Sequence, residues 1–505
     1  PILSRAIIHV KDNYVEPKRI DPKGMIVAAL DMVEKTVAEV MVDGDAKTGK
    51  LTVTVGTASK QFSIAEVDSI WKITPVMQEI MGFVQKHLVA HENLREIEYA
   101  AVNGMLSTLD PHSVMLEPKY FKEMKLQTKG EFGGLGFVIA MRDGNLTVVK
   151  VLKNTPAQRA GIKAKDVITK IEEQSTINMD LQDAVDHLRG KPNTKVAITV
   201  SRVAWTDAKR LQLSREVINV ESIPMAKLME NGIGYVKVTQ FSANSTRDLV
   251  GTLQQQRAQN GGALKGLVLD LRGNPGGLLE QAIQMSDLFL SEGVIVSTVG
   301  EGDRVRIHDT KEAHSDRDDL NQLPVIVLVN NSSASASEIV AGALKNNNRA
   351  LTIGRQTFGK GSVQVLYDFA DPSRPPEESA LKLTIAQYLT PPLPGSPGGV
   401  SIQEVGITPD VLLLPGRALK DAVNVFSPLR SSGEADLERH FSNPAEAALS
   451  QAERDKKIEE RKKRVEKAPL ELRYLMDEKE DKLAQALKAE AKREEARKAR
   501  EASKA

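Results

Sequence analysis

The stretch Gly266-Leu-Val-Leu-Asp-Leu-Arg-Gly-Asn-Pro-Gly-Gly277 joins a short apolar run to a turn that contains three glycines. The apolar run is typical of a buried strand, and the residues after the turn, Leu278–Leu290, have the spacing of a helix. Glycines in such a turn let a backbone N–H approach a ligand closely and face developing negative charge. A plain strand-to-helix connection explains the same residues and, taken alone, is the simpler interpretation. No Gly-Lys-Ser/Thr follows, which excludes a phosphate-binding loop.

The alternation of strand and helix continues on both sides of this stretch, from Asn231 to Pro415. Apolar runs of strand length alternate with segments of helical periodicity, which argues for an α/β core with some parallel strand pairing. The expected strands are Ile233–Val238, Gly266–Leu271, Val325–Val329, Leu351–Gly354, Gln364–Phe369 and Leu381–Tyr388, and the expected helices are Thr246–Ala258, Leu278–Leu290 and Ala336–Asn346.

Length and composition place this core within a multidomain chain. At roughly 150 residues per domain, 505 residues predict three to four domains. The longest apolar runs are far shorter than the ~18 residues of a membrane span, so no span is expected. Zero cysteines exclude disulfides, thiolate metal sites and a cysteine nucleophile, and a net charge of +1 gives no indication of a nucleic-acid partner. No export signal opens the chain, which is therefore either cytosolic or the mature part of an exported precursor.

The regions that flank the core have different patterns. Residues 1–118 are expected to be mainly helical with a hairpin insertion within residues 41–70, and residues 119–131 are expected to be a polar linker. Residues 417–505 are expected to form a charged helical region, because 32 of the 55 residues from Gln451 to Ala505 are charged. A solvated surface helix is the simpler interpretation of this tail, and a partner-binding or oligomer-forming arm is the alternative. Acidic residues interleave the basic ones, which argues against nucleic-acid binding.

A serine-rich segment, Asn330-Asn-Ser-Ser-Ala-Ser-Ala-Ser-Glu-Ile339, joins another expected strand to a helix. Ser335-x-x-Glu338 fits a capping box, which is a purely structural role. A serine at a helix N-terminus also has its oxygen near the positive end of the helix dipole, which stabilises an alkoxide or oxyanion. The local sequence fits both roles and favours the cap.

The next segment, Thr357-Phe-Gly-Lys-Gly-Ser362, places a lysine between two glycines and beside an aromatic side chain. If Lys360 is buried, its pKa falls, and a neutral amine becomes available as a base that activates a serine. The alternative is an exposed turn lysine, the usual state of this residue type. None of the eight histidines lies in a G-x-S-x-G context, and His112 is interpreted as part of a structural turn. No cluster of side chains supports a metal site.

Taken together, these motifs resemble the carboxyl-terminal processing, or tail-specific, serine proteases. The resemblance also rests on Leu109-Asp-Pro-His-Ser113, Gly134-Leu-Gly136 and Gly406-Ile-Thr-Pro-Asp410, and the motifs follow the family order over about residues 100–415. It implies an α/β multidomain protein. Its parts would be a ClpP/crotonase-like α/β protease core at residues 218–416, a PDZ domain inserted at residues 132–217, the helical N-terminal region and the charged helical C-terminal tail.

The resemblance also implies roles for individual residues. The family uses a serine nucleophile, a lysine base 25 residues later and a glutamine four residues beyond that, which correspond here to Ser335, Lys360 and Gln364. The glutamine would orient the lysine by hydrogen bonding. The oxyanion donors would be the amide of Ala336 and an amide of the turn formed by Gly276 and Gly277. Neither a metal ion nor an organic cofactor is implied.

A PDZ domain binds a peptide C-terminus by adding it as a strand beside one of its own strands. By the resemblance, the backbone amides of Gly134, Leu135 and Gly136 would receive the terminal carboxylate. Phe137 and Val138 would begin the strand that pairs with the peptide backbone.

The following helix would supply the rest of the groove. Leu181, Val185 and Leu188 would line its apolar pocket, although at least one of them is expected to serve only core packing. Arg189 corresponds to a family arginine linked to ligand sensing, for which a plain cation at the helix C-terminus is the alternative.

The resulting prediction is a serine endopeptidase of the bacterial periplasm or cell envelope that recognises protein C-termini and cleaves through an acyl-enzyme. Its partners would be protein substrates with apolar C-termini and an adaptor or activator protein, and the chain would form a homo-oligomer. A non-catalytic PDZ scaffold on a protease-derived fold is the alternative, and a serine–lysine hydrolase of small amides is a second rival. The intact Ser335, Lys360 and Gln364 argue against the scaffold, and the peptide-binding insert argues against the small-amide hydrolase.

Overall fold

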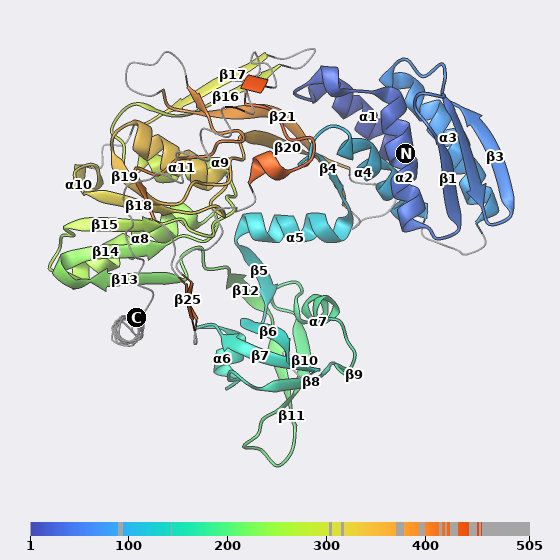
Figure 1. Ribbon diagram of the computed structural model, residues 1–505. Helices are drawn as coiled ribbons and strands as arrows, with labels where there is room; N and C mark the ends of the chain where they lie inside the picture. The colour runs from blue at the N-terminus through green and yellow to red at the C-terminus, as the bar shows by residue number, and fades with distance from the viewer. Residues whose placement is uncertain are drawn as a thin grey trace, which may run out of the picture.

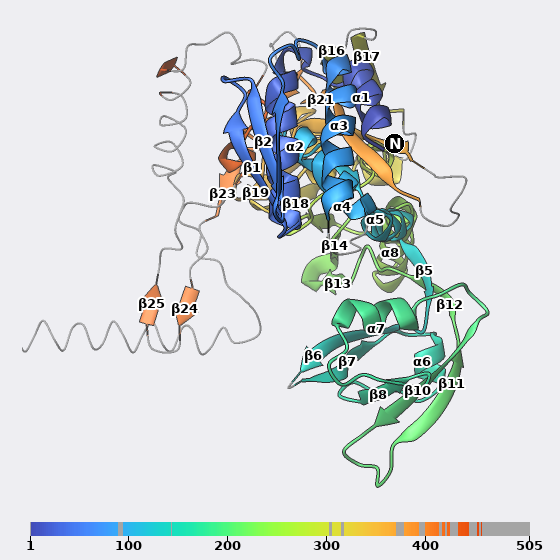
Figure 2. The same ribbon diagram turned by 90° about the vertical axis from the view of Figure 1, so that its right-hand side faces the viewer.

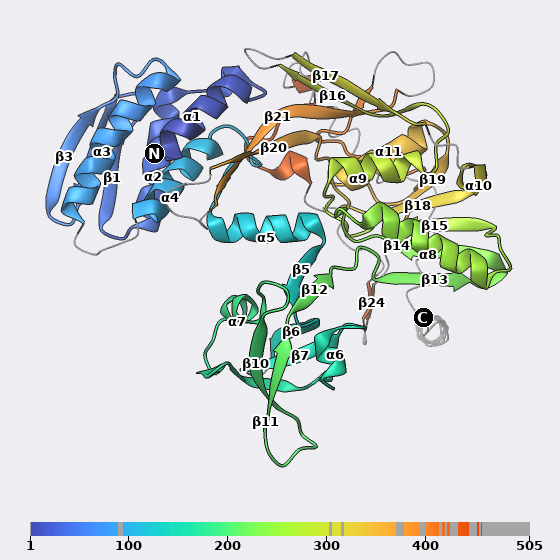
Figure 3. The ribbon, with the colours of Figure 1, turned by 180° about the vertical axis from the view of Figure 1, so that it is seen from behind.

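The computed structural model describes residues 2–88, 94–142, 144–301, 306–314, 318–369, 378–392, 399–413, 417–419, 422–424, 433–443, 452, 453 and 456. Within them, separate hydrophobic clusters mark the N-terminal region, the α/β core and the inserted domain. The N-terminal region and the α/β core lie side by side, and the inserted domain extends from them on a narrow connection (Figures 1 and 3). No helix among the described residues is long and apolar enough to cross a membrane.

The N-terminal region combines helices with a small antiparallel sheet. Alternate residues of its central strand are buried, so one face of the sheet packs on the helices (Figure 2). The expected hairpin is therefore part of a three-stranded sheet. The helices are α1 (Ile2–Asn13), η1 (Pro17–Arg19), α2 (Pro22–Thr36), η2 (Ile70–Lys72), α3 (Ile73–His87) and α4 (Leu94–Ser107), and the strands, in sheet order, are β1 (Val40–Asp45), β2 (Lys50–Val55) and β3 (Ala58–Ser63).

The segment expected to be a polar linker is instead a helix, α5 (Pro118–Lys129). Proline stands at its start, and Gly130 ends it with a left-handed φ of 70°, an asymmetry that marks a helix. Phe121 is its one buried residue, so the polar composition hides any apolar periodicity. Figure 1 shows α5 running beneath the two larger units toward the inserted domain.

The inserted domain is an antiparallel sheet with two helices, as expected for a PDZ domain. Its sheet order is β11-β10-β8-β7-β6, which leaves β6 at an edge. A two-stranded ribbon of β5 (Glu131–Gly134) and β12 (Glu216–Asn219) connects it to the rest of the chain. The elements are β6 (Phe137–Arg142), β7 (Asn145–Val151), α6 (Pro156–Arg159), β8 (Val167–Ile171), β9 (Gln174–Ser175), α7 (Leu181–Leu188), β10 (Lys195–Ser201) and β11 (Lys209–Ser214).

The α/β core contains a largely parallel sheet whose order is β13-β14-β15-β18-β19-β23. Only β13 runs antiparallel to its neighbour, and the strands predicted from apolar runs agree with β14, β15, β18 and β19 to within about two residues. The elements are β13 (Met225–Met229), η3 (Glu230–Gly232), β14 (Ile233–Lys237), α8 (Ser245–Gln259), β15 (Gly266–Asp270), α9 (Leu279–Asp287), α10 (Asp318–Asn321), β18 (Val325–Val329), α11 (Ala336–Asn346), β19 (Ala350–Gly354) and β23 (Val411–Leu412).

A second, antiparallel sheet has the order β17-β16-β21-β20, with β4 and β22 also paired to β21. Helix α11 contacts β19 of the first sheet and both β16 and β21 of the second, and it is buried on nearly all sides, as expected for a helix between two layers. The elements are β4 (Val114–Leu116), β16 (Val294–Glu301), β17 (Arg306–Glu312), β20 (Ser362–Asp368), β21 (Ala380–Thr390) and β22 (Val400–Ser401).

The described part of the C-terminal region is not a long helix. It contains a small hairpin of β24 (Arg417–Leu419) and β25 (Ala422–Asn424), and a segment, residues 433–443, with one short turn, η4 (Glu434–Asp436). Phe441 is fully buried in the same hydrophobic cluster as the N-terminal helices. Most of the charged tail beyond residue 443 lies outside the described residues.

Candidate active site

Ser335 lies at the junction of β18 and α11 in a strained backbone conformation. Its φ of 53° and ψ of −114° are unusual for a residue with a side chain, and such strain is concentrated at functional sites. The residue is half-buried at the start of an otherwise buried helix. The amide of Glu338 bonds to the Ser335 carbonyl oxygen at 2.8 Å, so the cap at this position does not depend on the Ser335 hydroxyl.

The neighbouring serines have structural roles or face solvent. The Ser333 hydroxyl donates to the carbonyl oxygen of Leu271 at 2.8 Å, and the Ser337 hydroxyl donates to that of Asn274 at 2.9 Å. Both side chains are fully buried, whereas Ser332 is exposed. These bonds fasten the serine-rich segment to the glycine turn after β15.

The glycine turn packs directly against Ser335. A side-chain carbon on Gly276 would lie 2.9 Å from the Ser335 Cβ and 3.0 Å from the Ala336 nitrogen, so a larger residue does not fit there. The prediction named an amide of the turn formed by Gly276 and Gly277, and of the two the Gly276 amide already donates to the Asn274 Oδ1 at 2.9 Å. The amides of Ala336 and Gly277 have no hydrogen-bond partner within the described residues, which leaves them as the candidate donors.

Lys360 lies in the loop of residues 357–361 that leads into β20; we call it the base loop. The pKa of Lys360 is lowered from its ordinary 10.5 to about 8, chiefly by burial and next by the positive charge of Lys382. Nearby carboxylates oppose this, with Glu434 the strongest of them. A fraction of Lys360 is therefore neutral near neutral pH, as a base requires. Its surroundings are not those of an ordinary exposed lysine.

Glu338 connects the Ser335 turn to the base loop. Its Oε2 accepts from the backbone N–H of Ser335 at 2.8 Å and from that of Lys360 at 3.0 Å. Its Oε1 accepts from the Thr357 hydroxyl at 2.5 Å and from the Gly359 N–H at 2.7 Å. The side chain is fully buried, and burial raises its pKa to about 7 although these hydrogen bonds favour the charged form. The nucleophile and base candidates thus share one oxygen atom through their backbones.

Gln364 lies on β20, but its amide group is turned to other partners. Its Nε2 donates to the Ser362 Oγ at 2.9 Å and to the Thr384 Oγ1 at 3.3 Å. Thr384 in turn donates to Asp110, a buried carboxylate of the Leu109-Asp-Pro-His-Ser113 turn. The expected hydrogen bond between Gln364 and Lys360 is not found within the described residues, so Gln364 supports the strand rather than the lysine in this structure.

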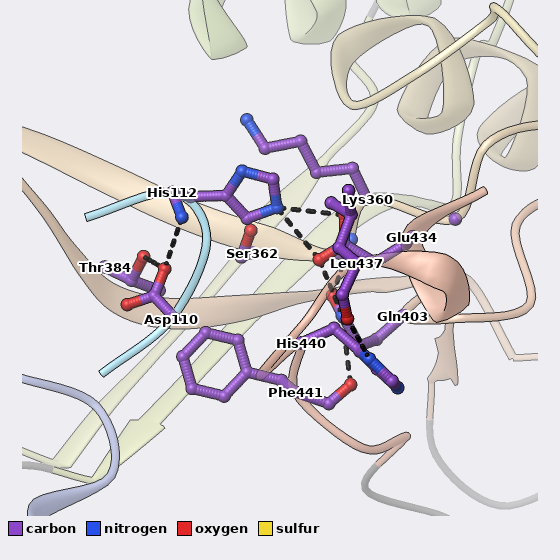
Figure 4. Close-up of polar contacts among 12 residues, drawn as sticks. Asp110, His112, Lys360, Ser362, Thr384, Gln403, Glu434, Leu437, His440 and Phe441 are labelled. Atoms are coloured by element: carbon purple, nitrogen blue, oxygen red, sulfur yellow. Dashed lines mark hydrogen bonds and ion pairs between the residues drawn. The ribbon is translucent and has the colours of Figure 1, made fainter. Parts of the chain in front are cut away.

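Three polar residues lie around the base loop: Gln403 and Glu434, which were not predicted from the sequence, and His112, which was interpreted as part of a structural turn (Figure 4). The Glu434 carboxylate is fully buried, lies 2.9 Å from the His112 Nε2 and accepts from the Gln403 Nε2 at 3.1 Å. The Gln403 Oε1 accepts from the Gly361 N–H at 3.0 Å. The proline-containing turn around His112 was the one available signal, because nothing in the sequence separates Glu434 from the many other acidic residues of its region.

The predicted peptide groove lies along the edge strand β6 and helix α7. Val138 is 46% exposed, and Leu181 and Val185 are half-buried, as a groove open to a ligand requires. Leu188 is instead part of the domain's own buried cluster, as was expected of at least one of the three; the Leu135 side chain belongs to the same cluster, and the role predicted for that residue is that of its backbone amide.

The loop before β6 has the backbone freedom expected of a carboxylate-binding turn. Gly136 has a left-handed φ of 83°, and a side-chain carbon there would collide with Thr155. Gly134 is partly committed elsewhere, because it pairs with Glu216 in the connecting ribbon. Phe137, the first residue of β6, is half-buried at the start of the free edge.

Arg189, at the end of α7, is not a free helix cation. It forms an ion pair with Glu123 of α5, and its guanidinium lies 4.6 Å from the centre of the Phe132 ring. The residue therefore links the inserted domain to the helix that leads into it. Among the described residues, no group of His, Asp or Glu side chains is arranged to hold a metal ion.

Comparisons with known proteins agree with this architecture. Residues 232–413 match Peptidase family S41, and residues 123–201 match the PDZ domain family. The carboxy-terminal-processing protease of Bartonella bacilliformis is 39% identical over 352 residues, which are 69% of this chain and 75% of that protein. The carboxyl-terminal-processing protease of Picosynechococcus is 35% identical over 331 residues, 65% of this chain and 75% of the relative. Among solved structures, the photosystem II D1 C-terminal processing protease is 26% identical, covering 78% of this chain and 93% of its own, with a TM-score of 0.37.

Proposed function

Because this chain belongs to the carboxyl-terminal processing proteases of Peptidase family S41 and is a serine-type peptidase with a PDZ domain, we propose that Ser335 is its nucleophile and Lys360 its general base. The observation that carries the assignment is the Glu338 carboxylate, one oxygen of which accepts from the backbones of both residues. The backbones of a strained serine and of a lysine with a pKa of about 8 are thereby fastened to the same carboxylate oxygen, which supports the proposal.

The proposed chemistry gives each of these groups one role. Neutral Lys360 takes the proton of the Ser335 hydroxyl as the oxygen attacks the scissile carbonyl carbon. The amides of Ala336 and Gly277 receive the negative charge that forms on the carbonyl oxygen. The Lys360 ammonium then gives its proton to the leaving amine, which leaves an acyl-enzyme. Water attacks the ester, Lys360 takes the water proton, and Ser335 is regenerated when the proton returns to it.

The inserted domain supplies the selection of substrates. We propose that it takes up the C-terminus of a polypeptide as an added strand at the free edge of β6, with an apolar last side chain near Leu181 and Val185. The exposure of Val138 and the half-buried state of the helix side chains support this groove. Gly136 and Phe137 stand at the end of the groove where the carboxylate would be bound.

A cleavage assay with an unfolded protein that ends in apolar residues tests the assignment. Ser335→Ala and Lys360→Arg should each remove cleavage, since guanidinium does not deprotonate in proteins. Ser332→Ala is the matched control, because Ser332 is an exposed serine of the same segment, and it should cleave like the wild type. Fragment masses identify the cut sites. Cleavage that persists in purified Ser335→Ala would refute the mechanism.

A non-catalytic peptide-binding scaffold is the rival function. It predicts that wild type and Ser335→Ala bind the same C-terminal peptides and that neither cuts them. Peptide affinity measured by fluorescence polarisation in both chains, together with the fragment assay, separates the two functions.

We further propose that the protein acts in the bacterial cell envelope as a homo-oligomer and works with an adaptor or activator protein. The relatives at 39% and 35% identity are bacterial proteins, which supports a bacterial source for this chain. Fractionation of cells, followed by light scattering on the purified chain, tests location and assembly, and recovery of one stoichiometric partner from the envelope fraction tests the adaptor.

A further inference from the structure

Residues 433–443, which we call the C-terminal strap, are built into the molecule rather than lying on it. The Phe441 ring is fully buried, with Tyr14 on one side and the Arg19 guanidinium 4.6 Å from the ring centre. Arg19 also donates to the carbonyl oxygens of Arg439 at 2.6 Å and His440 at 3.0 Å. A segment from a charged region thus has its hydrophobic anchor in the N-terminal helical core.

The other end of the strap contacts the base loop. The Glu434 N–H donates to the Phe358 carbonyl oxygen at 2.9 Å. Gln403 bridges the same two segments, because its Oε1 accepts from the Gly361 N–H while its Nε2 donates to Glu434 and to the Phe441 carbonyl oxygen. The base loop therefore has two attachments. Glu338 of α11 accepts from its backbone N–H groups, and Glu434 of the strap donates to its Phe358 carbonyl oxygen.

The Glu434 carboxylate also acts on the charge of Lys360. A fully buried carboxylate is rare unless it is paired, and here it lies 2.9 Å from the His112 Nε2. Its negative charge raises the pKa of Lys360, as do the charges of Glu338 and Asp110, whereas burial and Lys382 lower it. His112 lies against Glu434, and the strap residue His440 bonds to Glu404, whose backbone N–H donates to the Gly359 carbonyl oxygen of the base loop, so these groups also face this region.

We propose that the C-terminal strap is a working part of the active site and that Glu434 is a positioning residue for Lys360. It keeps the base loop in place through the Phe358 carbonyl oxygen and Gln403, and its charge sets the proton affinity of the lysine. The proposal rests on the proposed function for its effect on cleavage, but its electrostatic half concerns Lys360 alone.

Glu434→Gln tests both halves, because the amide has nearly the same shape but removes both the charge and the carboxylate that His112 and Gln403 contact. The pH dependence of single-turnover cleavage should move to lower pH, by about half a unit to one unit, so that about two-and-a-half- to fivefold more of the lysine is neutral at pH 7. The plateau rate at high pH should fall by about ten- to a hundredfold, since the loop is held less firmly. Glu438→Gln is the matched control: Glu438 is an exposed carboxylate of the same strap, and both readouts should stay at the wild-type values.

A second measurement does not need cleavage. In the Ser335→Ala chain, the rate at which acetic anhydride modifies Lys360 can be followed against pH by peptide mass spectrometry. The midpoint should lie near about 8 and should fall when Glu434→Gln is added. Glu434→Asp keeps the charge and should leave the midpoint close to that of the parent chain, which a merely structural role would not predict.

The outcomes separate this proposal from the proposed function. Absence of Ser335-dependent cleavage in the wild type would refute the function while the acetylation profiles still report on Glu434. Ser335-dependent cleavage whose plateau and midpoint are both unchanged in Glu434→Gln would overturn the strap proposal. If Glu434→Gln does not fold, Glu434→Asp decides it: a Lys360 midpoint that has dropped with the charge still present would also overturn it.

Discussion

Removal of the Lys382 charge should move the pH dependence of cleavage upward, opposite to the effect of Glu434→Gln. Lys382 lies on β21, paired with Leu366 of β20, and its charge is the largest influence after burial that lowers the pKa of Lys360. Replacement by glutamine removes this repulsion, so the Lys360 ammonium becomes more stable and less of the lysine is neutral at a given pH.

The size of the effect follows from the neutral fraction of the base. A lysine with a pKa of about 8 is about 10% neutral at pH 7, whereas one with its ordinary pKa is about 0.03% neutral, so the surroundings supply about 300-fold more base. If the Lys382 charge accounts for about one pH unit of this, Lys382→Gln should lower the single-turnover rate at pH 7 about tenfold. The plateau at high pH should be unchanged, because there the lysine is neutral in both proteins.

Single-turnover cleavage from about pH 6 to 10, under conditions where chemistry limits the rate, measures the midpoint directly. Lys227→Gln is the matched control, since Lys227 is an exposed lysine on β13 of the other sheet, and its profile should coincide with that of the wild type. A midpoint that falls or stays fixed in Lys382→Gln would refute the assignment of Lys360 as a desolvated base under the influence of this charge.

Three further outcomes are expected. Gly276→Ala should lower cleavage by about a hundredfold or more while peptide binding in the inserted domain is retained, because the new carbon would lie 2.9 Å from the Ser335 Cβ; wild-type turnover would contradict the packing. Lys360→Met should unfold at higher urea concentration below about pH 8, by up to about 3 kcal/mol, with the difference vanishing as pH rises toward 10.5, since the unfolded chain binds more protons in that window. Val185→Asp should weaken peptide binding and cleavage together, and amidation of the substrate C-terminus should weaken binding to the wild type; equal rates for free and amidated substrates would show that the carboxylate is not recognised.

The α/β core could be predicted well because its strands are buried on both faces. β15 and β18 appear in the sequence as continuous apolar runs, and the helix after β18 begins at the expected residue. Helix α5 was missed because one buried residue in twelve leaves no apolar stripe to detect. Its proline start and glycine end were present in the sequence, however, and would have identified it.

The active site divides in the same way. Ser335 and Lys360 belong to local motifs, so spacing and family resemblance were enough to select them as candidates. The use of the Gly276 amide and the orientation of Gln364 depend on which buried acceptor lies nearby, here Asn274 and Thr384, and no local pattern states this. Glu434 is even harder to predict from the sequence, because its contact with His112 joins residues 322 positions apart.

The attachment of the inserted domain determines how its role has to be tested. The last residues before the domain bond to the core, where the Thr128 carbonyl oxygen accepts from the Ala243 N–H, and the first residues after it return to the same place, where the Val220 N–H donates to Gly130. Two residues before Ala243, the Phe241 N–H donates to the Gly276 carbonyl oxygen, so this loop also supports the turn beside the nucleophile.

Deletion of residues 132–217 would break the ribbon of β5 and β12 and disturb this junction, and an inactive product would not distinguish lost peptide recognition from a displaced oxyanion turn. A groove variant such as Val185→Asp keeps every bond of the junction. Its loss of cleavage on substrates with a free C-terminus, with unchanged cleavage of amidated ones, would therefore assign the effect to recognition of the carboxylate-bearing end. Equal loss on both substrates would place the effect in the shape of the active site instead.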